Sequence, residues 1–305
     1  MIAPIIFIHY GNSPYLEYTL KLAKFKNPDK EVILLGDISN KKIAQGASAT
    51  HFYFEDYFKG KEAETFKKVY KFIAGNQKRK SYWTNFVFKR WFCIYNFLKE
   101  KKIQKFWTFD SDTLILTDLS VLENQFRDID CTTQCNGICM NGLVNNLISV
   151  EDYINKINEL FTRENYLENQ EKAFSTHPDW AFTEMRAFAT YKEESGIKTA
   201  RSNMIVNNSV FDENICQEDS FETEFYKNAN RNIKKLYFQN GDVFEKRKRD
   251  DKLIKLNAIN MSWVPLSIIE KVYYYKRYGS LPNIWVKLMF FSKKIPRFIE
   301  RLLRI

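Results

Sequence analysis

The sequence of 305 residues has little histidine, cysteine, glycine or proline, with 3 His, 5 Cys, 10 Gly and 7 Pro. So little glycine and proline excludes a collagen-like or low-complexity chain. An odd number of cysteines in a long chain indicates no disulfide framework and favours a reducing compartment. No apolar run approaches the roughly 18 residues of a membrane span, and no basic segment precedes the short apolar run near the N-terminus. We therefore expect a cytoplasmic protein, either soluble or bound peripherally to the inner face of a membrane.

Three of the cysteines, Cys131, Cys135 and Cys139, are spaced four residues apart. This spacing fits no zinc or iron–sulfur signature. Asn136-Gly137 would also break a helix that carried all three. We expect buried or half-buried thiols here rather than a metal cluster.

What the sequence does contain is apolar, aromatic and basic: 45% hydrophobic, 16% aromatic and 28% charged residues, with a net charge of +10. This balance excludes a disordered chain, and the length suits one large α/β domain with at most a small appendage. A basic excess favours phosphate-bearing partners, which include nucleotides, nucleic acids and anionic membrane surfaces.

The first forty residues read as one β-α-β unit. Pro4–His9 is a short apolar run that ends in a turn, and apolar residues at helical spacing follow up to Asn27-Pro28. Glu31–Leu35 is a second strand, so we expect a parallel sheet with a right-handed crossover. Further patterns predict helices at Phe66–Ile73, Val87–Leu98, Ser149–Phe161, Pro178–Gly196 and Pro265–Tyr278, and strands at Lys105–Phe109 and Leu253–Ile259.

The most informative segment is Asp110-Ser111-Asp112, which follows the apolar strand Lys105–Phe109 and precedes a second apolar run. Carboxylates just past the carboxyl end of a strand lie where open α/β sheets bind ligands. Carboxylate oxygens suit Mg²⁺ or Mn²⁺, which can bridge a diphosphate. An acidic turn without function is the alternative, and the strand context argues against it.

In this context the sequence resembles the GT-A-fold, nucleotide-sugar-dependent glycosyltransferases, especially small members that build polysaccharides or surface glycans. The resemblance covers roughly residues 4 to 262, and its one specific piece is the Asp-x-Asp motif. Supporting pieces are Pro4–Tyr10, Val32–Asp37, Asn136-Gly137, Pro178–Trp180 and Asn208–Asp212. The resemblance implies a Rossmann-type, mostly parallel sheet flanked by helices. It also implies a nucleotide-sugar donor, a glycan or lipid-linked acceptor, and Mn²⁺ or Mg²⁺ as cofactor.

The resemblance also implies roles for single residues. The nucleotide-sugar contacts would come from Tyr10, Gly11, Asp37, Arg90, Asp110, Ser111, Asn136 and Gly137. Tyr10 and Gly11 would lie beside the base and ribose, and Asp37 would hydrogen-bond one of them. Arg90, at the start of a helix, would contact the diphosphate or the sugar. Two plainer interpretations stay open: Asp37 as a turn cap and Arg90 as a solvated surface charge.

The metal ligands implied by the resemblance are Asp110, Asp112 and Asn260. Many relatives carry a histidine in a late strand, and Asn260 occupies the best matching position here. An amide oxygen binds a hard cation more weakly than a charged ligand does. His177 is the alternative that would complete the site.

The candidate general base is Asp179, beside Trp180, which could stack on a sugar face. This assignment holds only if the reaction inverts the anomeric centre. Asp179 could instead serve only as a favourable charge at a helix N-terminus.

The chain ends in a basic and aromatic segment. From Trp285 to Ile305 it has six basic residues and one acidic residue, Glu300. Apolar and basic residues fall on opposite faces, as in amphipathic helices that lie on anionic membranes. We therefore expect a glycosyltransferase domain at 1–264 and a C-terminal helical extension at 265–305. A helix docked on the core is the alternative.

Two other functions remain open at this stage. A nucleotidyltransferase that makes the activated sugar would need a glycine-rich, basic loop after the first strand, whereas Gly11–Pro14 has one Gly and no base. A basic nucleic-acid-binding module is permitted by the charge, but the sequence contains no recognised motif of that kind.

Overall fold

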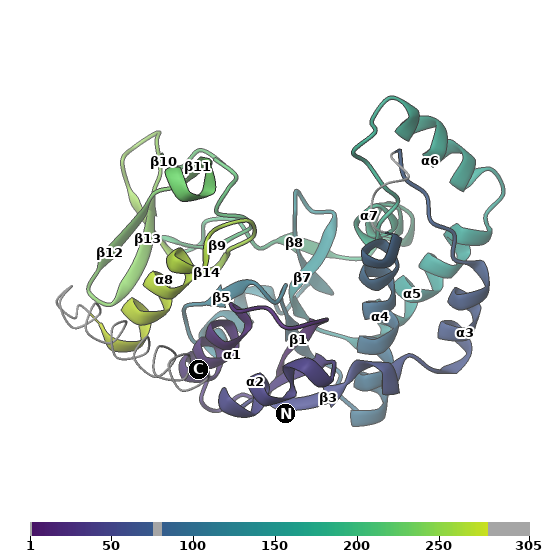
Figure 1. The fold of residues 1–305 in the computed structure, drawn as a ribbon, viewed down its shortest axis with the longest axis horizontal. Coiled ribbons are helices and arrows are strands. Elements are labelled where there is room, and N and C mark those ends of the chain that lie inside the picture. Colours follow the sequence, from purple (N-terminus) through teal and green to yellow (C-terminus); the bar gives the residue numbers. More distant parts are fainter. Residues whose placement is uncertain (1, 76–80, 280–305) are drawn as a thin grey trace, which may run out of the picture.

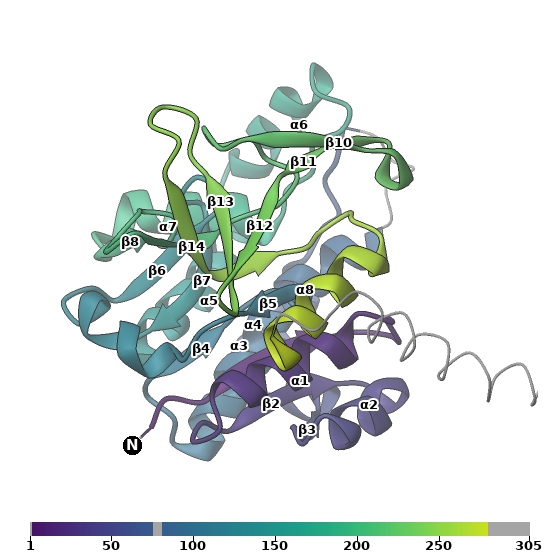
Figure 2. The same cartoon turned by 90° about the vertical axis from the view of Figure 1, so that its left-hand side faces the viewer.

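The computed structural model describes residues 2–75 and 81–279. A seven-stranded sheet forms its centre, and a second sheet lies beside it (Figures 1 and 2). The seven strands, in spatial order, are β3 (Thr50–Tyr53), β2 (Val32–Gly36), β1 (Ile5–His9), β4 (Phe106–Thr108), β7 (Cys139–Val144), β6 (Cys131–Gln134) and β8 (Thr199–Arg201).

The central sheet is mostly parallel. β3, β2, β1 and β4 run in one direction, and β6 is parallel to β8. β7 alone is antiparallel to its neighbours β4 and β6. β1 and β2 are buried at every position, which is typical of parallel strands covered on both faces.

Helices cover both faces of this sheet. Along the described residues the helices are α1 (Leu16–Lys26), α2 (Lys41–Gly46), α3 (Gly60–Val69), α4 (Ser81–Lys101), α5 (Leu147–Thr162), α6 (Tyr166–Ser175), α7 (Glu184–Ser195) and α8 (Leu266–Tyr278). Of these, α8 packs on α1 and the second sheet rather than on the central sheet. Ile6 and Ile8 of β1 point into a core shared with α3, α4, α5 and α7, whereas Ile5 and Phe7 point toward α1 and α2. The predicted α/β fold, with a mostly parallel sheet flanked by helices, is confirmed.

The second sheet has the order β12 (Leu236–Gln239), β13 (Asp242–Lys246), β14 (Leu253–Asn260) and β5 (Thr113–Ile115), and β9 (Ser209–Asp212) pairs with β14 in parallel. β10 (Thr223–Tyr226) and β11 (Arg231–Lys234) form a separate hairpin. Short 3₁₀-helices occupy Ile38–Asn40, Phe54–Tyr57, Leu119–Phe126 and Lys227–Ala229. Because β5 directly follows the Asp-x-Asp motif, this sheet and the central one meet at that motif.

The helix predicted at Pro265–Tyr278 is present as α8 and packs on the core. The Tyr18 hydroxyl of α1 donates to Glu270 at 2.6 Å, and Lys276 forms an ion pair with Asp242 at 2.7 Å. The first part of the predicted extension is therefore docked on the domain. The amphipathic segment 285–305 lies outside the described residues. Within residues 2–75 and 81–279, no helix combines the length and apolar character needed to cross a membrane.

Four local predictions were wrong. The helix expected at Phe66–Ile73 is α3, which begins at Gly60 and ends at Val69. The helix expected from Pro178 begins at Glu184, although it ends before Gly196 as expected, with Gly196 at φ +68°. α5 begins at Leu147 because Asn146, rather than Ser149, caps it by accepting the Ser149 N–H. Arg90 lies in the middle of α4, since that helix already begins at Ser81.

Candidate active site

The candidate site lies where β1, β2 and β4 end. These parallel strands lie side by side, so the residues that follow them, Tyr10, Asp37 and Asp110, reach the same edge of the sheet. The sequence alone could not fix this neighbourhood, because it depends on the order of the strands. The structure thus brings together the two strand-end segments and the acidic motif that the sequence singled out.

Gly11 and Asp37 are in direct contact. The Gly11 N–H donates to one carboxylate oxygen of Asp37, and the other oxygen accepts from the Ser39 N–H at 2.7 Å. Gly11 has φ +85°, a conformation that favours glycine. Burial by itself would raise the pKa of Asp37, but the hydrogen bonds from Ser39 and Gly11 outweigh it and hold the pKa below its ordinary value. Asp37 is therefore an ionised acceptor, and it also caps a 3₁₀ turn, as the plainer interpretation held.

An exposed aromatic group stands beside this turn. The side chain of Tyr10 is 50% exposed, and its ring lies 5.1 Å from that of Tyr82 and 6.0 Å from those of Phe54 and Phe86. The side chain of Asn40 supports the turn by donating to the backbone carbonyls of His9 and Gly11, each at 3.2 Å. The arrangement offers a flat apolar surface next to a carboxylate.

Arg90 joins two carboxylates. Its guanidinium donates to Asp110 at 2.9 Å and to Glu184 at 3.0 Å. The side chain of Arg90 is 15% exposed and that of Glu184 is 6% exposed, so Arg90 is not a solvated surface charge. Burial raises the pKa of Glu184, although Arg90 opposes that shift. Sequence analysis missed Glu184, whose only local signal was an acidic residue in the first turn of α7.

Asp112 is held by one residue at the end of β14 and by another that lies two positions further along the chain. One oxygen of Asp112 accepts from the Asn260 side-chain NH₂ at 3.2 Å, and the other accepts from the Ser262 hydroxyl at 2.8 Å. Asn260 therefore lies beside Asp112, as the resemblance implied, but its amide oxygen accepts the Ser262 N–H at 3.0 Å. Burial, and then the neighbouring Asp110 carboxylate, raise the pKa of Asp112 to about 6.

Ser111, between the two aspartates, contacts β1. Its hydroxyl lies 2.8 Å from the His9 Nδ1 atom. Burial lowers the pKa of His9 to about 4, although Asp37 opposes that shift, so the imidazole is neutral at pH 7. The motif is thus connected to the strand that carries Tyr10 and Gly11.

Asn136 and Gly137 form the turn between β6 and β7, with φ of +59° and +83°. The Asn136 N–H donates to Glu213 at 3.2 Å, and its side-chain oxygen accepts from Arg201 at 3.2 Å. The Lys192 ammonium donates to the Gly137 carbonyl at 2.6 Å. The predicted loop after a strand is present and is fixed by charged neighbours. Of the three nearby cysteines, Cys131 and Cys139 are buried and Cys135 is half-buried, and all are free thiols.

Asp179 lies exposed in the segment between α6 and α7. Trp180 is 42% exposed and stacks on His177 with 3.8 Å between ring centroids. The acidic residue that opens α7 and reaches the motif through Arg90 is Glu184. The roles of Asp179 as base and of His177 as metal ligand stay predictions.

The donor set at the motif fits a divalent cation. Asp110 and Asp112 supply hard oxygen atoms, and their mutual repulsion, which contributes to the raised pKa of Asp112, is what a cation would relieve. Among the described residues, no group of three or more His, Cys, Asp or Glu side chains could hold a metal. A cation here would therefore take its remaining ligands from phosphates and water, as Mg²⁺ often does.

No protein-family model matches this sequence, and no curated protein is significantly similar to it. Several solved structures are similar in fold. The PaToxG glycosyltransferase shares 13% identity over 63% of this chain and 69% of its own, with a TM-score of 0.36. Mouse xyloside xylosyltransferase 1 shares 9% identity over 65% of this chain and 84% of its own, with a TM-score of 0.40.

A cytidylyltransferase from Leptospira borgpetersenii shares 14% identity over 65% of this chain and 74% of its own, with a TM-score of 0.32. Similarities at this level carry no conclusion about the activity of this chain. The proposals that follow therefore rest on the residues of the site.

Proposed function

We propose that this chain is a glycosyltransferase that moves a sugar from a nucleotide-diphosphate-sugar to a glycan or lipid-linked acceptor with the help of Mn²⁺ or Mg²⁺. The observation that carries the proposal is the placement of Asp110 and Asp112. They follow β4 at the edge of the sheet where β1 and β2 also end, beside Tyr10, Gly11 and Asp37. This edge is where open α/β sheets take nucleotide ligands.

The base and ribose of the donor would lie against the end of β1. Tyr10, exposed and backed by Tyr82 and Phe86, offers a ring for stacking on a base. Asp37 is an ionised acceptor for a ribose hydroxyl, since its pKa lies below the ordinary value. Its contact with the Gly11 N–H holds the carboxylate close to that ring.

The diphosphate would lie toward Asp110 and Asp112. A cation held by these carboxylates would neutralise the charge that builds on the departing nucleoside diphosphate. Arg90 is already engaged by Asp110 and Glu184, so its charge is balanced within the protein. We therefore assign Arg90 as a positioning residue for Asp110 rather than a direct ligand of the diphosphate. Asn260 and Ser262 position Asp112 in the same way.

The attacking acceptor hydroxyl must lose its proton. Asp179 remains our candidate for this base, because it is exposed and lies next to the exposed ring of Trp180. Glu184 is unsuited to the task, since it is buried and paired with Arg90. The assignment requires a reaction that inverts the anomeric centre.

The experiment that tests the proposal measures donor hydrolysis and transfer with a panel of nucleotide sugars, with and without Mn²⁺. A glycosyltransferase cleaves at least one donor, and chelation removes the activity. A nucleotidyltransferase would instead release pyrophosphate from a nucleoside triphosphate and a sugar phosphate. Salt-sensitive binding of nucleic acid without turnover of any donor would contradict both enzymatic functions.

A further inference from the structure

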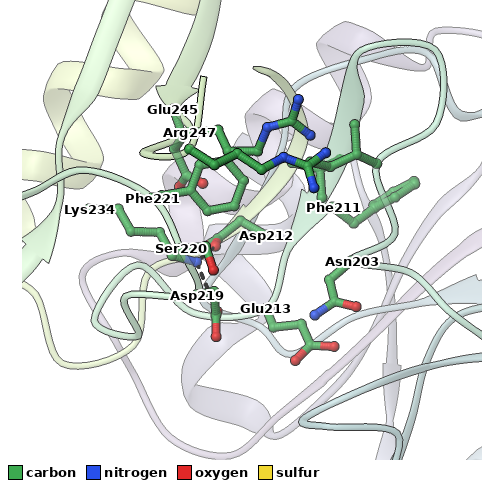
Figure 3. A pocket seen from close by; sticks show the side chains of 13 residues that line it. Asn203, Phe211, Asp212, Glu213, Asp219, Ser220, Phe221, Lys234, Glu245 and Arg247 are labelled. Carbon is green, nitrogen blue, oxygen red and sulfur yellow. Dashed lines mark hydrogen bonds and ion pairs between the residues drawn. The ribbon is translucent and has the colours of Figure 1, made fainter. Parts of the chain in front are cut away.

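A second acidic cluster surrounds an open cavity of about 420 Å³ beside β9, β11 and β13 (Figure 3). The residues that carry the argument are Asp212, Asp219, Phe221, Lys234 and Glu245. Nothing in the proposed transfer reaction uses these side chains. Asp212 ends the segment Asn208–Asp212 that supported the resemblance, and the other four come from strands and loops to which sequence analysis gave no role.

Glu245 is the unusual member of this cluster. It is fully buried on β13, and within the described part of the chain neither of its carboxylate oxygens has a hydrogen-bond partner. Figure 3 shows Glu245 among the side chains that line the cavity. A buried carboxylate without a partner is costly, so it must either hold a proton or receive a donor.

Asp212 presents a third acceptor to the same cavity. One of its oxygens accepts from the Lys234 ammonium, and the other has no partner among the described residues. Lys234 also reaches Asp219 at 3.1 Å. The floor thus holds three carboxylates, of Asp212, Asp219 and Glu245, against the single ammonium of Lys234.

The other charged residues lining the cavity are already engaged or lie toward solvent. Glu213 accepts from the Asn136 N–H and pairs with Arg201 at 3.5 Å. Arg247 forms an ion pair with Asp250 at 2.5 Å, and Arg249 is exposed. With Glu245 ionised, the floor therefore carries three negative charges against the one positive charge of Lys234, while Arg249 lies toward solvent.

We propose that this cavity binds the ammonium group of an amino sugar. An ammonium has three N–H donors, and the floor presents three unpartnered oxygens, two on Glu245 and one on Asp212. It also supplies the missing charge, which a neutral hydroxyl does not. Phe221 also lines the cavity, but it is 7% exposed and belongs to the adjacent apolar core, so the ammonium rather than the sugar ring would carry recognition.

A metal ion is a poorer occupant of the same floor. Among the described residues, the carboxylates of this floor form no set of three that could hold a metal, and the donor phosphates proposed to complete a cation site at Asp110 and Asp112 are not placed here. Burial, and then Asp212, raise the pKa of Glu245 well above its ordinary value. A bound ammonium would stabilise the ionised carboxylate and lower that pKa, and any proton that the carboxyl group held would leave to water.

The cavity lies near the candidate active site. Asp212 ends β9 and pairs in register with Ile259 of β14, and the next residue, Asn260, contacts Asp112. Amine binding itself does not depend on sugar transfer. That the bound amino sugar is the acceptor rests on the proposed function.

The test measures equilibrium binding to the full chain by calorimetry, with glucosamine, glucose and N-acetylglucosamine as probes. These sugars share a ring, but only glucosamine carries an ammonium. We expect glucosamine to bind at least tenfold more tightly than the other two. Equal affinities, or no glucosamine binding at millimolar concentration, would overturn the proposal.

Glu245→Gln removes the charge and keeps the shape, so it should weaken glucosamine binding at least tenfold. Because Glu245 has no hydrogen-bond partner among the described residues, the variant loses no such bond and should fold, which circular dichroism checks. The matched control is Glu224→Gln, an exposed residue on β10, which should bind as the wild type does. Unchanged affinity in Glu245→Gln contradicts the proposal.

Two further measurements distinguish amine binding in the cavity from anion binding and from sugar transfer. Inorganic phosphate should not compete with glucosamine; competition would assign the cavity to an anion held by Arg247 and Arg249, and would overturn the proposal. Asp112→Asn should lose transfer while keeping glucosamine binding, so failure of the proposed function and failure of this inference give different results.

Discussion

The chain holds two groups of carboxylates near the ends of neighbouring strands, and they differ in how their charges are balanced. Around Asp110 and Asp112, each carboxylate has at least one partner, supplied by Arg90, Asn260 or Ser262. Around Asp212, Glu245 is buried with neither oxygen paired among the residues described. The carboxylates of the first group are therefore held in position by their partners, whereas Glu245 in the second group can still accept hydrogen bonds from a ligand.

This difference bears on what each group binds. Asp110 is 38% exposed although Arg90 holds one of its oxygens, so it can still meet a hydrated cation and phosphates. Glu245 is fully buried, so its carboxylate can meet a donor only through the cavity that it lines. Exposed, pre-positioned carboxylates suit a metal and its phosphate ligands, whereas an enclosed, unpaired one suits a protonated amine.

The largest effect should come from Asp112→Asn, which removes a charge and little volume. If a cation at this motif supplies several kcal/mol to departure of the diphosphate, transfer should fall by roughly 10⁴-fold. Donor binding should weaken as well, because the cation bridges protein and phosphates. Turnover and donor affinity measured with Mn²⁺ check both.

The control for that variant is Asp128→Asn, since Asp128 is exposed and, in the part of the chain that the structure describes, pairs with its neighbour Arg127 at 3.3 Å. It should behave as the wild type. Full activity in Asp112→Asn, or activity that a chelator does not change, would end the claim that a metal assists the reaction.

Asp179→Asn tests a residue that belongs to neither group of carboxylates. A general base contributes about 10²–10⁴-fold in rate, and the amide keeps the size of the side chain but not its basicity. Turnover should fall by that factor while donor affinity stays nearly unchanged. If the variant keeps most of its turnover, or if the product retains the anomeric configuration of the donor, Asp179 is not the base.

Removing Arg90 should leave the carboxylates of Asp110 and Glu184 without the cation that pairs with both. Arg90→Met leaves Glu184, 6% exposed, without its cation, and breaking a buried pair in this way costs about 3–5 kcal/mol of stability. The double variant Arg90→Met/Glu184→Gln should recover part of that loss in denaturant unfolding. A single variant as stable as the wild type would show that Arg90 does not hold the group together.

The sequence predicted the part of the site that depends on local pattern. Asp110-Ser111-Asp112 lies directly after an apolar strand, and the glycine at the end of β1 precedes a polar turn, so both could be found by inspection. Glu184 could not, because it reaches Arg90 across 94 positions of the chain. Its placement depends on how α4 and α7 pack, which no local spacing encodes.

The same reasoning explains why β11 was missed. In β11, Arg231 and Asn232 are exposed, and the buried residues are Ile233 and Lys234. A lysine can be buried there because Asp212 and Asp219, from other segments, pair with its ammonium. Burial that depends on distant partners leaves no apolar alternation in the sequence, so hydrophobic periodicity could not reveal this strand.

The smallest predicted effect concerns the unpaired carboxylate and follows from the direction of its pKa. Burial, and then Asp212, raise the pKa of Glu245 in the folded chain above its value in the unfolded chain. The folded state therefore holds the proton more tightly, so this group stabilises the fold most below its unfolded pKa. That stabilisation is lost as the pH rises from there toward the folded pKa.

Glu245→Gln has no proton to lose and should escape this loss. The variant should melt close to the wild type near pH 5 and above it near pH 8, by roughly 2–4 °C for each 1 kcal/mol recovered. Asp212, whose pKa burial raises to about 6, titrates in both proteins, so much of its effect should cancel in the difference between them. The melting temperature of the exposed control, Glu224→Gln, should differ from that of the wild type by the same small amount at both pH values. If the melting temperature of Glu245→Gln does not rise above that of the wild type toward pH 8, Glu245 has a partner in solution. The Glu245 carboxylate would then already be paired, as those of Asp110 and Asp112 are, and it would not bind an amine.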